Sequence, residues 1–204
     1  MLRENDCVAD PVLSSALDST RDERTGVTLA NVELTLAWNL RGNATDAALA
    51  AAATRLFGFA LPVQPNTSAR SDDAALLWLG PASWLFVAEP DPSGPPFDDA
   101  RRSLNAVGGA LFDLSSSFTG WRVAGPTASR VLNRGCPLDL GDDAFPAGHC
   151  AQSTLGHLAA LVHRPDESPT FIVIVARSFA KDAWALLRAS AATEGYPSDA
   201  LTTS

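Results

Sequence analysis

The sequence predicts an α+β fold of two tandem halves, each with the element order β-α-β-β-α that is typical of a ferredoxin-like unit. Apolar residues alternate with polar ones in the expected strands and recur every three to four positions in the expected helices. The order repeats along the chain. Helices are expected to begin at residues 46 and 97 and again at 127 and 178, so that each pair lies 81 residues apart. A chain of 204 residues is long enough for two packed halves.

The first half begins at Val27, where apolar and polar residues alternate up to Leu36 and indicate a half-buried strand. A helix follows between a capping residue, Thr45 or Asp46, and Gly58, which ends it. The remaining elements expected here are strands at Leu76–Leu79 and Trp84–Ala88, a helix over residues 97–107 that ends at Gly108, and a strand at Ala110–Leu114.

The second half repeats this order from a strand at Phe118–Ala124. Gly125-Pro126 then opens a helix with proline at its first position, and Gly135 ends that helix. The remaining elements expected here are strands at Leu155–Val162 and Phe171–Ala176 and a closing helix from Ser178.

The chain is therefore expected to divide into halves over residues 27–114 and 115–196, with a tail over residues 197–204. Residues 1–26 mix charges, serines and a proline without apolar periodicity. They fit two interpretations, a floppy terminus or an arm that becomes ordered only against a partner.

Composition excludes some partners and compartments. The formal net charge is −8, and Lys181 and fourteen scattered arginines form no basic run for nucleic acid or an anionic membrane. Residues 1–12 lack the apolar core of a signal peptide, and no stretch approaches the roughly 20 apolar residues of a membrane-spanning helix. Three cysteines cannot all pair within one chain, so we expect a reduced, cytoplasmic protein.

The segment from Gly135 to Gln152, GCPLDLGDDAFPAGHCAQ, contains two of the three cysteines. A zinc site would need four ligands in close pairs, whereas thirteen residues separate Cys136 from Cys150 and His149 adjoins Cys150. Cys136 also follows the end of a predicted helix, where the helix dipole disfavours a thiolate. Both cysteines are therefore expected to be small buried residues rather than metal ligands or nucleophiles.

Other chemical motifs are missing from the sequence. Ser115–Ser117 lack the G-x-S-x-G elbow of hydrolases, and Asp113 before them is expected to cap a turn. There is no G-x-G-x-x-G or P-loop motif, and Asp142-Asp143 lacks the alternating ligands of a calcium loop. We therefore expect no catalytic, cofactor-binding or metal-binding residues in this chain. The five tryptophans are expected in the core, with an interface as the alternative.

Several segments, in a fixed order, resemble the gamma subunit family of heterotetrameric sarcosine oxidase. They cover most of residues 27–190, and the combination of GCPLDL, FPxGxCAQ and RSFA is more specific than any one of them. The segments are LRGNATDA (40–47), Ala60–Pro62, LWLGPASWLF (77–86), DLSSSFTGWRVAGPTASRVLNRGCPLDL (113–140), FPAGHCAQSTLG (145–156) and RSFAKDAW (177–184).

The resemblance implies a non-catalytic gamma subunit of a flavin-dependent oxidoreductase complex. Such a complex demethylates sarcosine to glycine and transfers the one-carbon unit to tetrahydrofolate. Its implied partners are large alpha and medium beta flavoprotein subunits and a small delta subunit. FAD, FMN, NAD and tetrahydrofolate then belong to the complex, with none bound by this chain.

The family is also similar to the folate-binding aminomethyltransferase domain, which agrees with the tandem halves. Gly148–Gln152 is an imperfect match to a glycine-cysteine motif of that domain. Two alternative functions stay open: a stand-alone folate-binding aminomethyltransferase-like module, and the gamma-type subunit of a related N-methyl amino acid dehydrogenase. A free-standing cysteine enzyme, a third, has no supporting signature.

The same segment, residues 135–152, is the expected contact with another subunit. Leu138, Leu140 and Phe145 would leave an apolar patch on a monomer if they faced water, and such patches mark interfaces. The alternative is that these side chains fold back under the second sheet. The candidate interface residues are Gly135, Cys136, Pro137, Leu138, Asp139, Leu140, Phe145, Pro146, Gly148, Cys150 and Gln152.

Overall fold

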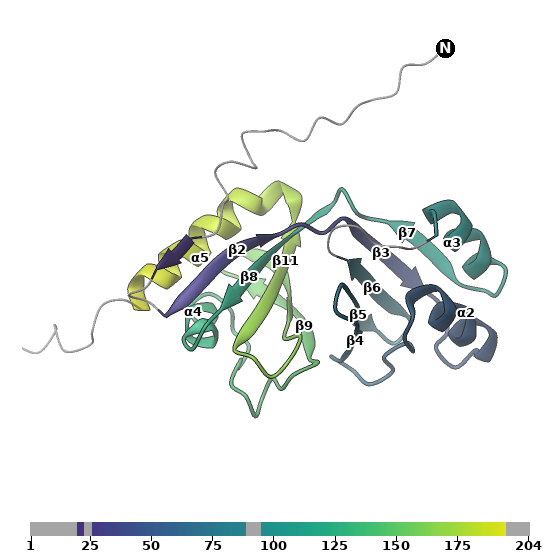
Figure 1. The fold of residues 1–204 in the computed structure, drawn as a ribbon, viewed down its shortest axis with the longest axis horizontal. Coiled ribbons are helices and arrows are strands. Elements are labelled where there is room, and N and C mark those ends of the chain that lie inside the picture. The colour runs from purple at the N-terminus through teal and green to yellow at the C-terminus, as the bar shows by residue number, and fades with distance from the viewer. Residues whose placement is uncertain (1–19, 23–25, 89–94, 195–204) are drawn as a thin grey trace, which may run out of the picture.

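The computed structural model describes residues 20–22, 26–88 and 95–194. Two antiparallel sheets face each other, and a pair of helices covers the outer side of each sheet (Figure 1). The α+β class predicted from the sequence is confirmed. The predictions for residues 1–19 and 197–204 lie outside the described residues.

One sheet has the strand order β4-β5-β6-β3-β7 and carries α2 and α3 on its outer side (Figure 1). The strands are β3 (Leu36–Arg41), β4 (Ser68–Arg70), β5 (Ala74–Gly80), β6 (Ser83–Ala88) and β7 (Ala110–Asp113), and the helices are α2 (Ala47–Phe57) and α3 (Phe97–Asn105). Asp46 caps α2 by accepting hydrogen bonds from the backbone N–H groups of Ala48 and Leu49, and Gly58 ends it with φ of 84°. Both predictions for this helix are confirmed.

The other sheet has the strand order β1-β2-β8-β11-β10-β9 and carries α4 and α5 (Figure 1). The strands are β1 (Thr20–Asp22), β2 (Val27–Val32), β8 (Phe118–Ala124), β9 (Cys150–Leu155), β10 (Leu158–His163) and β11 (Thr170–Ala176). The helices are α4 (Ala128–Asn133), the short 3-10 turn η1 (Arg177–Phe179) and α5 (Ala180–Glu194).

The two sheets correspond strand by strand: β7-β3-β6-β5-β4 in one matches β2-β8-β11-β10-β9 in the other. The prediction of ferredoxin-like halves is therefore confirmed, but the single strand expected over residues 27–36 is wrong. The chain leaves the first strand after Val32, and β2 pairs with β8 while β3 pairs with β6 and β7 in the opposite sheet. Residues 27–32 therefore add a strand to the sheet of the second half. This strand has the position that corresponds to β7 in the sheet of the first half.

A close backbone approach holds β2 beside β8. Gly125, at the end of β8, has φ of +127°, and a Cβ there would lie 2.2 Å from the carbonyl oxygen of Gly26. Only glycine fits this position. Pro126 does not open the following helix as predicted, because the turn after Gly125 delays its start until Ala128, with Thr127 as the N-cap residue.

The strand predicted over residues 155–162 is confirmed from Leu158 onward as β10, but its start is wrong, because residues 156–157 form a turn that joins it to β9. Leu155 pairs with Leu158, and Gly156, with φ of +61°, forms the turn with His157. The polar residues Gln152, Ser153 and Thr154 in the centre of β9 concealed this strand.

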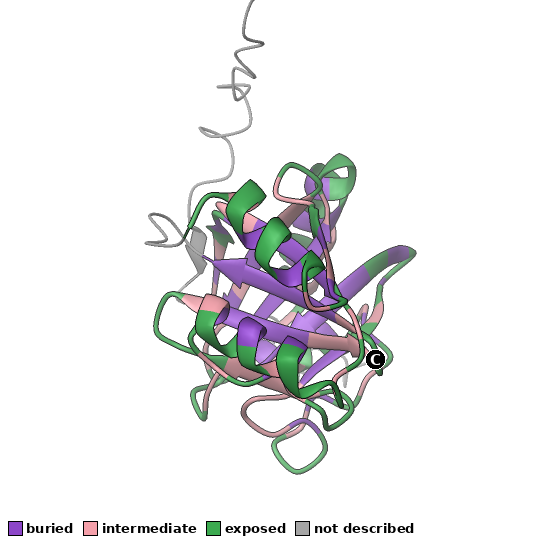
Figure 2. Ribbon diagram, turned by 90° about the vertical axis from the view of Figure 1, so that its right-hand side faces the viewer, coloured by how far each residue is buried: buried purple, intermediate pink, exposed green. Residues whose placement is uncertain are grey.

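Three apolar clusters form the core. One lies between α4, α5 and their sheet, one between α2, α3 and theirs, and the third between the two sheets. In β11, Phe171 and Val173 face the helices while Ile172 and Ile174 face the other sheet. Because both of its faces are covered, the central strand β11 reads as a continuous apolar run, and Figure 2 shows buried strands behind helices whose outer surfaces are exposed. Within the described residues, no helix is long and apolar enough to cross a membrane.

Candidate functional site

The segment 135–152 leaves α4 and returns to the sheet as β9. Leu140 and Phe145 are 0% and 5% exposed and belong to the cluster beneath α4 and α5, and half-buried Leu138 packs against them. Of the two alternatives for these side chains, the structure shows the fold-back under the second sheet. Pro137, Asp139 and Gln152 are exposed. Contact of this segment with another subunit stays a prediction.

The end of this segment joins the two halves of the chain through backbone hydrogen bonds. Cys150 N–H donates to the carbonyl of Asn66 at 2.9 Å, and Ser68 N–H donates to the carbonyl of Gly148 at 2.8 Å. Thr67 and His149 form an antiparallel bridge between them. We call this junction of residues 66–68 with residues 148–150 the seam.

Two side chains of the GHCAQ motif extend the seam to β5. The Cys150 thiol donates to the carbonyl oxygens of Thr67, at 3.3 Å, and Trp78, at 3.6 Å. The Gln152 amide donates to the carbonyl of Leu79 at 2.8 Å. Gly148, Cys150 and Gln152 from the candidate interface therefore contact the other half of their own chain.

The environment of Cys150 opposes reactivity. The side chain is fully buried between the sheets, and burial raises the pKa of its thiol to about 12. A thiol in this state holds its proton at neutral pH and is a poor nucleophile. Cys136 is buried in the separate cluster beneath the helices, with Ser153 Oγ 3.7 Å from its sulfur. Among the described residues, no group of three or more His, Cys, Asp and Glu side chains could hold a metal ion.

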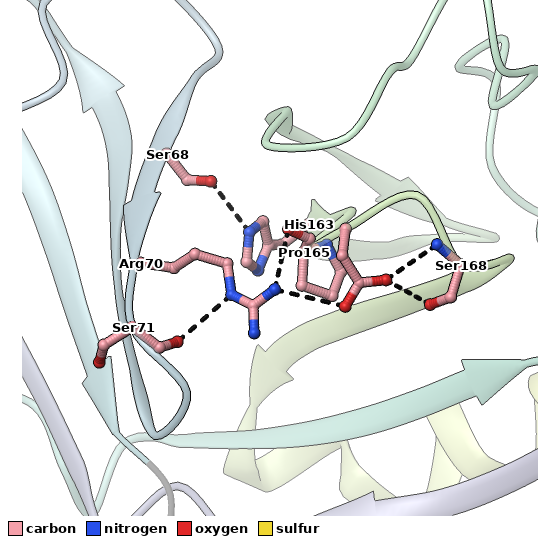
Figure 3. A network of polar contacts seen from close by, with 7 residues as sticks. Ser68, Arg70, Ser71, His163, Pro165 and Ser168 are labelled. Carbon is pink, nitrogen blue, oxygen red and sulfur yellow. Dashed lines mark hydrogen bonds and ion pairs between the residues drawn. The ribbon is translucent and has the colours of Figure 1, made fainter.

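A second feature beside the seam is a polar network between the sheets (Figure 3). Ser68 Oγ donates its single proton to the carbonyl of Gly148 at 2.9 Å. It must therefore accept from His163 Nε2, which lies 3.0 Å away. This assigns the proton of the neutral imidazole to Nε2 and leaves Nδ1 as an acceptor. His163 is 3% exposed, and burial, with the nearby Arg70 charge, lowers its pKa from 6.5 to about 4.

Arg70 provides the other cross-link of this network. Its Nη1 lies 3.3 Å from both Asp166 Oδ2 and the carbonyl of Pro165, and its Nε donates to the carbonyl of Ser71 (Figure 3). Asp166 also accepts from the hydroxyl and the N–H of Ser168. The Ser168 hydroxyl, followed by its N–H and Arg70, holds the pKa of Asp166 below its usual value.

A cleft of about 100 Å³ opens between the sheets at this network. Its apolar lining comes from the cluster between the sheets and includes Val32, Leu34, Ala75, Val87, Ile172 and Ile174. His163 also lines the cleft, together with five charged groups: Arg70, Asp72, Asp73, Arg122 and Asp166.

Arg164, next to His163, fixes the 135–152 segment from the other side. The residue is 3% exposed, and its guanidinium donates to the carbonyl of Phe145 at 3.1 Å and lies 2.8 Å from Asp142 Oδ1. Its charge also stands 5.8 Å above the ring of Phe171. The segment is therefore held as a fixed part of the fold.

Arg177 of the RSFA motif holds the crossover between β7 and β8. Its N–H donates to the carbonyl of Ser117 at 2.8 Å, and its Nε donates to that of Ser116 at 2.8 Å. Asp113 accepts from the N–H and hydroxyl of Ser115, which confirms the predicted turn cap. Trp38, Trp84, Trp121 and Trp184 are buried, as expected for core residues.

Sequence reasoning missed Ser68, Arg70, His163 and Asp166. His163 was a histidine at the end of an apolar strand, and the other three stand in short polar stretches without a motif. No signal in the sequence joins residues 68–70 to residues 163–166, because the contact is made between β4 and the end of β10, more than ninety residues apart.

The comparisons with known proteins agree with this fold. The family model described as "Sarcosine oxidase, gamma subunit family" matches residues 41–193. The chain is 34% identical over 133 residues to the sarcosine oxidase subunit gamma of Arthrobacter sp., covering 65% of this chain and 63% of the relative. It is 33% identical over 145 residues to that of Corynebacterium sp. strain U-96, covering 69% and 68%. The match thus spans a little under two thirds of the Arthrobacter subunit.

Solved structures give the same relation. A chain of the heterotetrameric sarcosine oxidase from Corynebacterium sp. U-96, in complex with pyrrole 2-carboxylate, matches with a TM-score of 0.79 and 26% identity over 91% of this chain and 94% of that one. The aminomethyltransferase T of the glycine cleavage system from Bartonella henselae shares the fold, with a TM-score of 0.56 and 15% identity over 78% of this chain and 44% of that one. Both the resemblance read from the motifs and the aminomethyltransferase-like fold are confirmed. The chain belongs to the sarcosine oxidase gamma subunit family.

Proposed function

We propose that this chain is the non-catalytic gamma subunit of a heterotetrameric sarcosine oxidase-type complex. The complex oxidatively demethylates sarcosine to glycine and transfers the one-carbon unit to tetrahydrofolate. The observation that carries the proposal is the fit of this chain to one subunit of a solved heterotetrameric sarcosine oxidase over nearly the full length of both. The fully buried, protonated Cys150 thiol supports a non-catalytic role for the motif that carries it.

The partners and cofactors follow from this assignment. We propose large alpha, medium beta and small delta subunits as partners, in the cytoplasm. FAD, FMN, NAD and tetrahydrofolate are assigned to those subunits and none to this chain. The residues on the exposed side of the 135–152 segment, Pro137 and Asp139, are proposed contacts with one of these subunits.

Co-expression of this chain with the alpha, beta and delta subunits of a sarcosine oxidase-type complex from the same organism tests the proposal. We expect one co-purifying assembly that oxidises sarcosine and shows flavin absorbance, and a chain that shows neither when purified alone. Full assembly and turnover without this chain would overturn the proposal. Turnover of another N-methyl amino acid in place of sarcosine would favour the related dehydrogenase.

A stand-alone folate-binding module is the second candidate, because the fold is shared with an aminomethyltransferase. Titration of the isolated chain with tetrahydrofolate, followed by calorimetry, separates the two. Saturable binding would favour the module, and no binding at millimolar ligand would exclude it.

A further inference from the structure

The cleft between the sheets combines an apolar floor with unpaired polar groups. Six buried side chains from both halves form the floor, so a contact there involves both sheets. A volume of about 100 Å³ is suited to one apolar side chain rather than to a cofactor, since ligand pockets usually measure about 300–1,000 Å³.

The charges around the cleft are not balanced. Arg70 is engaged by Asp166, and Arg122 has a partner of its own. Asp72 and Asp73 are exposed, and neither forms an ion pair or a side-chain hydrogen bond with any part of the chain that the structure describes. The five charged groups leave an excess of one negative charge, which the neutral His163 does not offset.

His163 adds a hydrogen-bonding group to the lining of the cleft. The ring lines the cleft, it is 3% exposed, and its Nε2 proton is used by Ser68 (Figure 3). No described residue donates a hydrogen bond to Nδ1, so an occupant of the cleft that carries an N–H can donate to it. An occupant with an apolar group, a positive charge and an N–H donor would match every feature of the cleft.

We propose that this cleft receives a segment of another subunit in which an apolar side chain stands beside a lysine or arginine. The apolar side chain fills the cleft, the basic group faces Asp72 and Asp73, and an N–H of the segment donates to His163 Nδ1. Anchors of this kind, an apolar group in a pocket within a charged rim, dominate binding energy at protein interfaces. The inference rests on the proposed function, since it names where the other subunits meet this chain.

Charge argues against a second copy of this chain as the occupant. The chain carries a net charge of −8, so a second copy would bring further negative charge to a carboxylate rim.

The test uses the full chain co-expressed with the other subunits, with assembly measured as the fraction that co-elutes and as the affinity in a titration of the purified chain. The variant Asp72→Asn/Asp73→Asn raises the net charge by two and disturbs no hydrogen bond. We expect its affinity to fall at least about tenfold, and its dependence on salt to become weaker than that of the wild type. Ala75→Leu, which adds volume at a lining residue that faces the other sheet, should weaken assembly similarly.

Asp182→Lys is the matched control, because it also raises the net charge by two at an exposed position on α5, away from the cleft. Its affinity should stay within about twofold of the wild type. Equal thermal unfolding of all variants would show that folding is unchanged.

The outcomes separate this inference from the proposed function. If the wild-type chain does not assemble with the flavoprotein subunits, the proposed function fails and the cleft has no subunit to bind. If the wild type assembles and the cleft variants assemble equally well, the inference is wrong while the function stands. Self-association of the isolated chain that Asp72→Asn/Asp73→Asn abolishes would identify a second copy as the occupant and also overturn it.

Discussion

Replacing His163 with glutamine should flatten the pH dependence of folding stability between pH 6.5 and about pH 4. His163 lies between the sheets, donates to Ser68 and faces the positive charge of Arg70. A second positive charge on the imidazole would be buried next to the first. The glutamine amide can still donate to Ser68 but takes up no proton in this range.

The magnitude follows from the two pKa values. In the unfolded chain His163 takes up a proton as the pH falls below its ordinary value of 6.5, whereas in the folded chain it stays neutral until about pH 4. The unfolded state therefore binds more protons in this window, so the free energy of unfolding decreases as the pH falls. The contribution of the neutral ring is fully present above pH 6.5 and is lost on acidification. The gap between 6.5 and about 4 corresponds to about 3 kcal/mol.

Urea unfolding followed by tryptophan fluorescence at several pH values measures this difference. The wild type should lose about 3 kcal/mol more stability between neutral pH and pH 4 than His163→Gln does. His157→Gln is the control, since His157 is exposed in the turn between β9 and β10 and should leave the wild-type slope unchanged. Equal slopes for the wild type and His163→Gln would refute this role of the buried ring.

Three further predictions concern packing and local structure. Gly125→Ala should destabilise the fold by about 2 kcal/mol or more in urea unfolding, because its Cβ would lie 2.2 Å from the Gly26 carbonyl; Gly80→Ala, where no atom lies within 4 Å, is the control and should change stability little. In a Cys7→Ser background, Cys136 and Cys150 should react with a thiol reagent at pH 8 only as fast as the protein unfolds, and rapid labelling of the native chain would contradict their burial. Asp46→Ala should cost about 1 kcal/mol because the two cap bonds to α2 are lost, and an unchanged urea midpoint would show that the cap contributes nothing.

Local signals in the sequence were sufficient to predict the bounds of elements that begin or end at a capping residue or a glycine. Strand β8 has the predicted bounds, Phe118–Ala124, and α2 begins after Asp46 and ends at Gly58. Each of these depends on residues within a few positions, a capping carboxylate or a glycine with positive φ. Helix α4 shows the limit, because the turn that shifted its start depends on the contact of Gly125 with Gly26, about one hundred residues away.

The two strand errors arise because local pattern does not report a change of sheet or a tight turn. In residues 27–36 the alternation of apolar and polar residues continues past Val32, although the chain changes sheets there. In residues 155–162 the turn at Gly156 separates β9 from β10, and the polar residues Gln152–Thr154 concealed β9. The cleft could not be predicted either, because its floor consists of ordinary core residues and its polar groups come from elements that are distant in the sequence.

The motifs by which the chain resembles its family mark where its halves are joined. Cys150 and Gln152 of GHCAQ bond to Trp78 and Leu79 of LWLG, and RSFA holds the crossover through Arg177. β2 adds a topological link, since it leaves the first half to complete the second sheet. The two halves are thus connected in three places: at the seam, at the crossover between β7 and β8, and through β2, which lies in the sheet of the second half. The cleft lies between the two halves. Because its lining comes from both halves, its shape depends on these joints, and a change at the seam should weaken assembly even where it touches no partner.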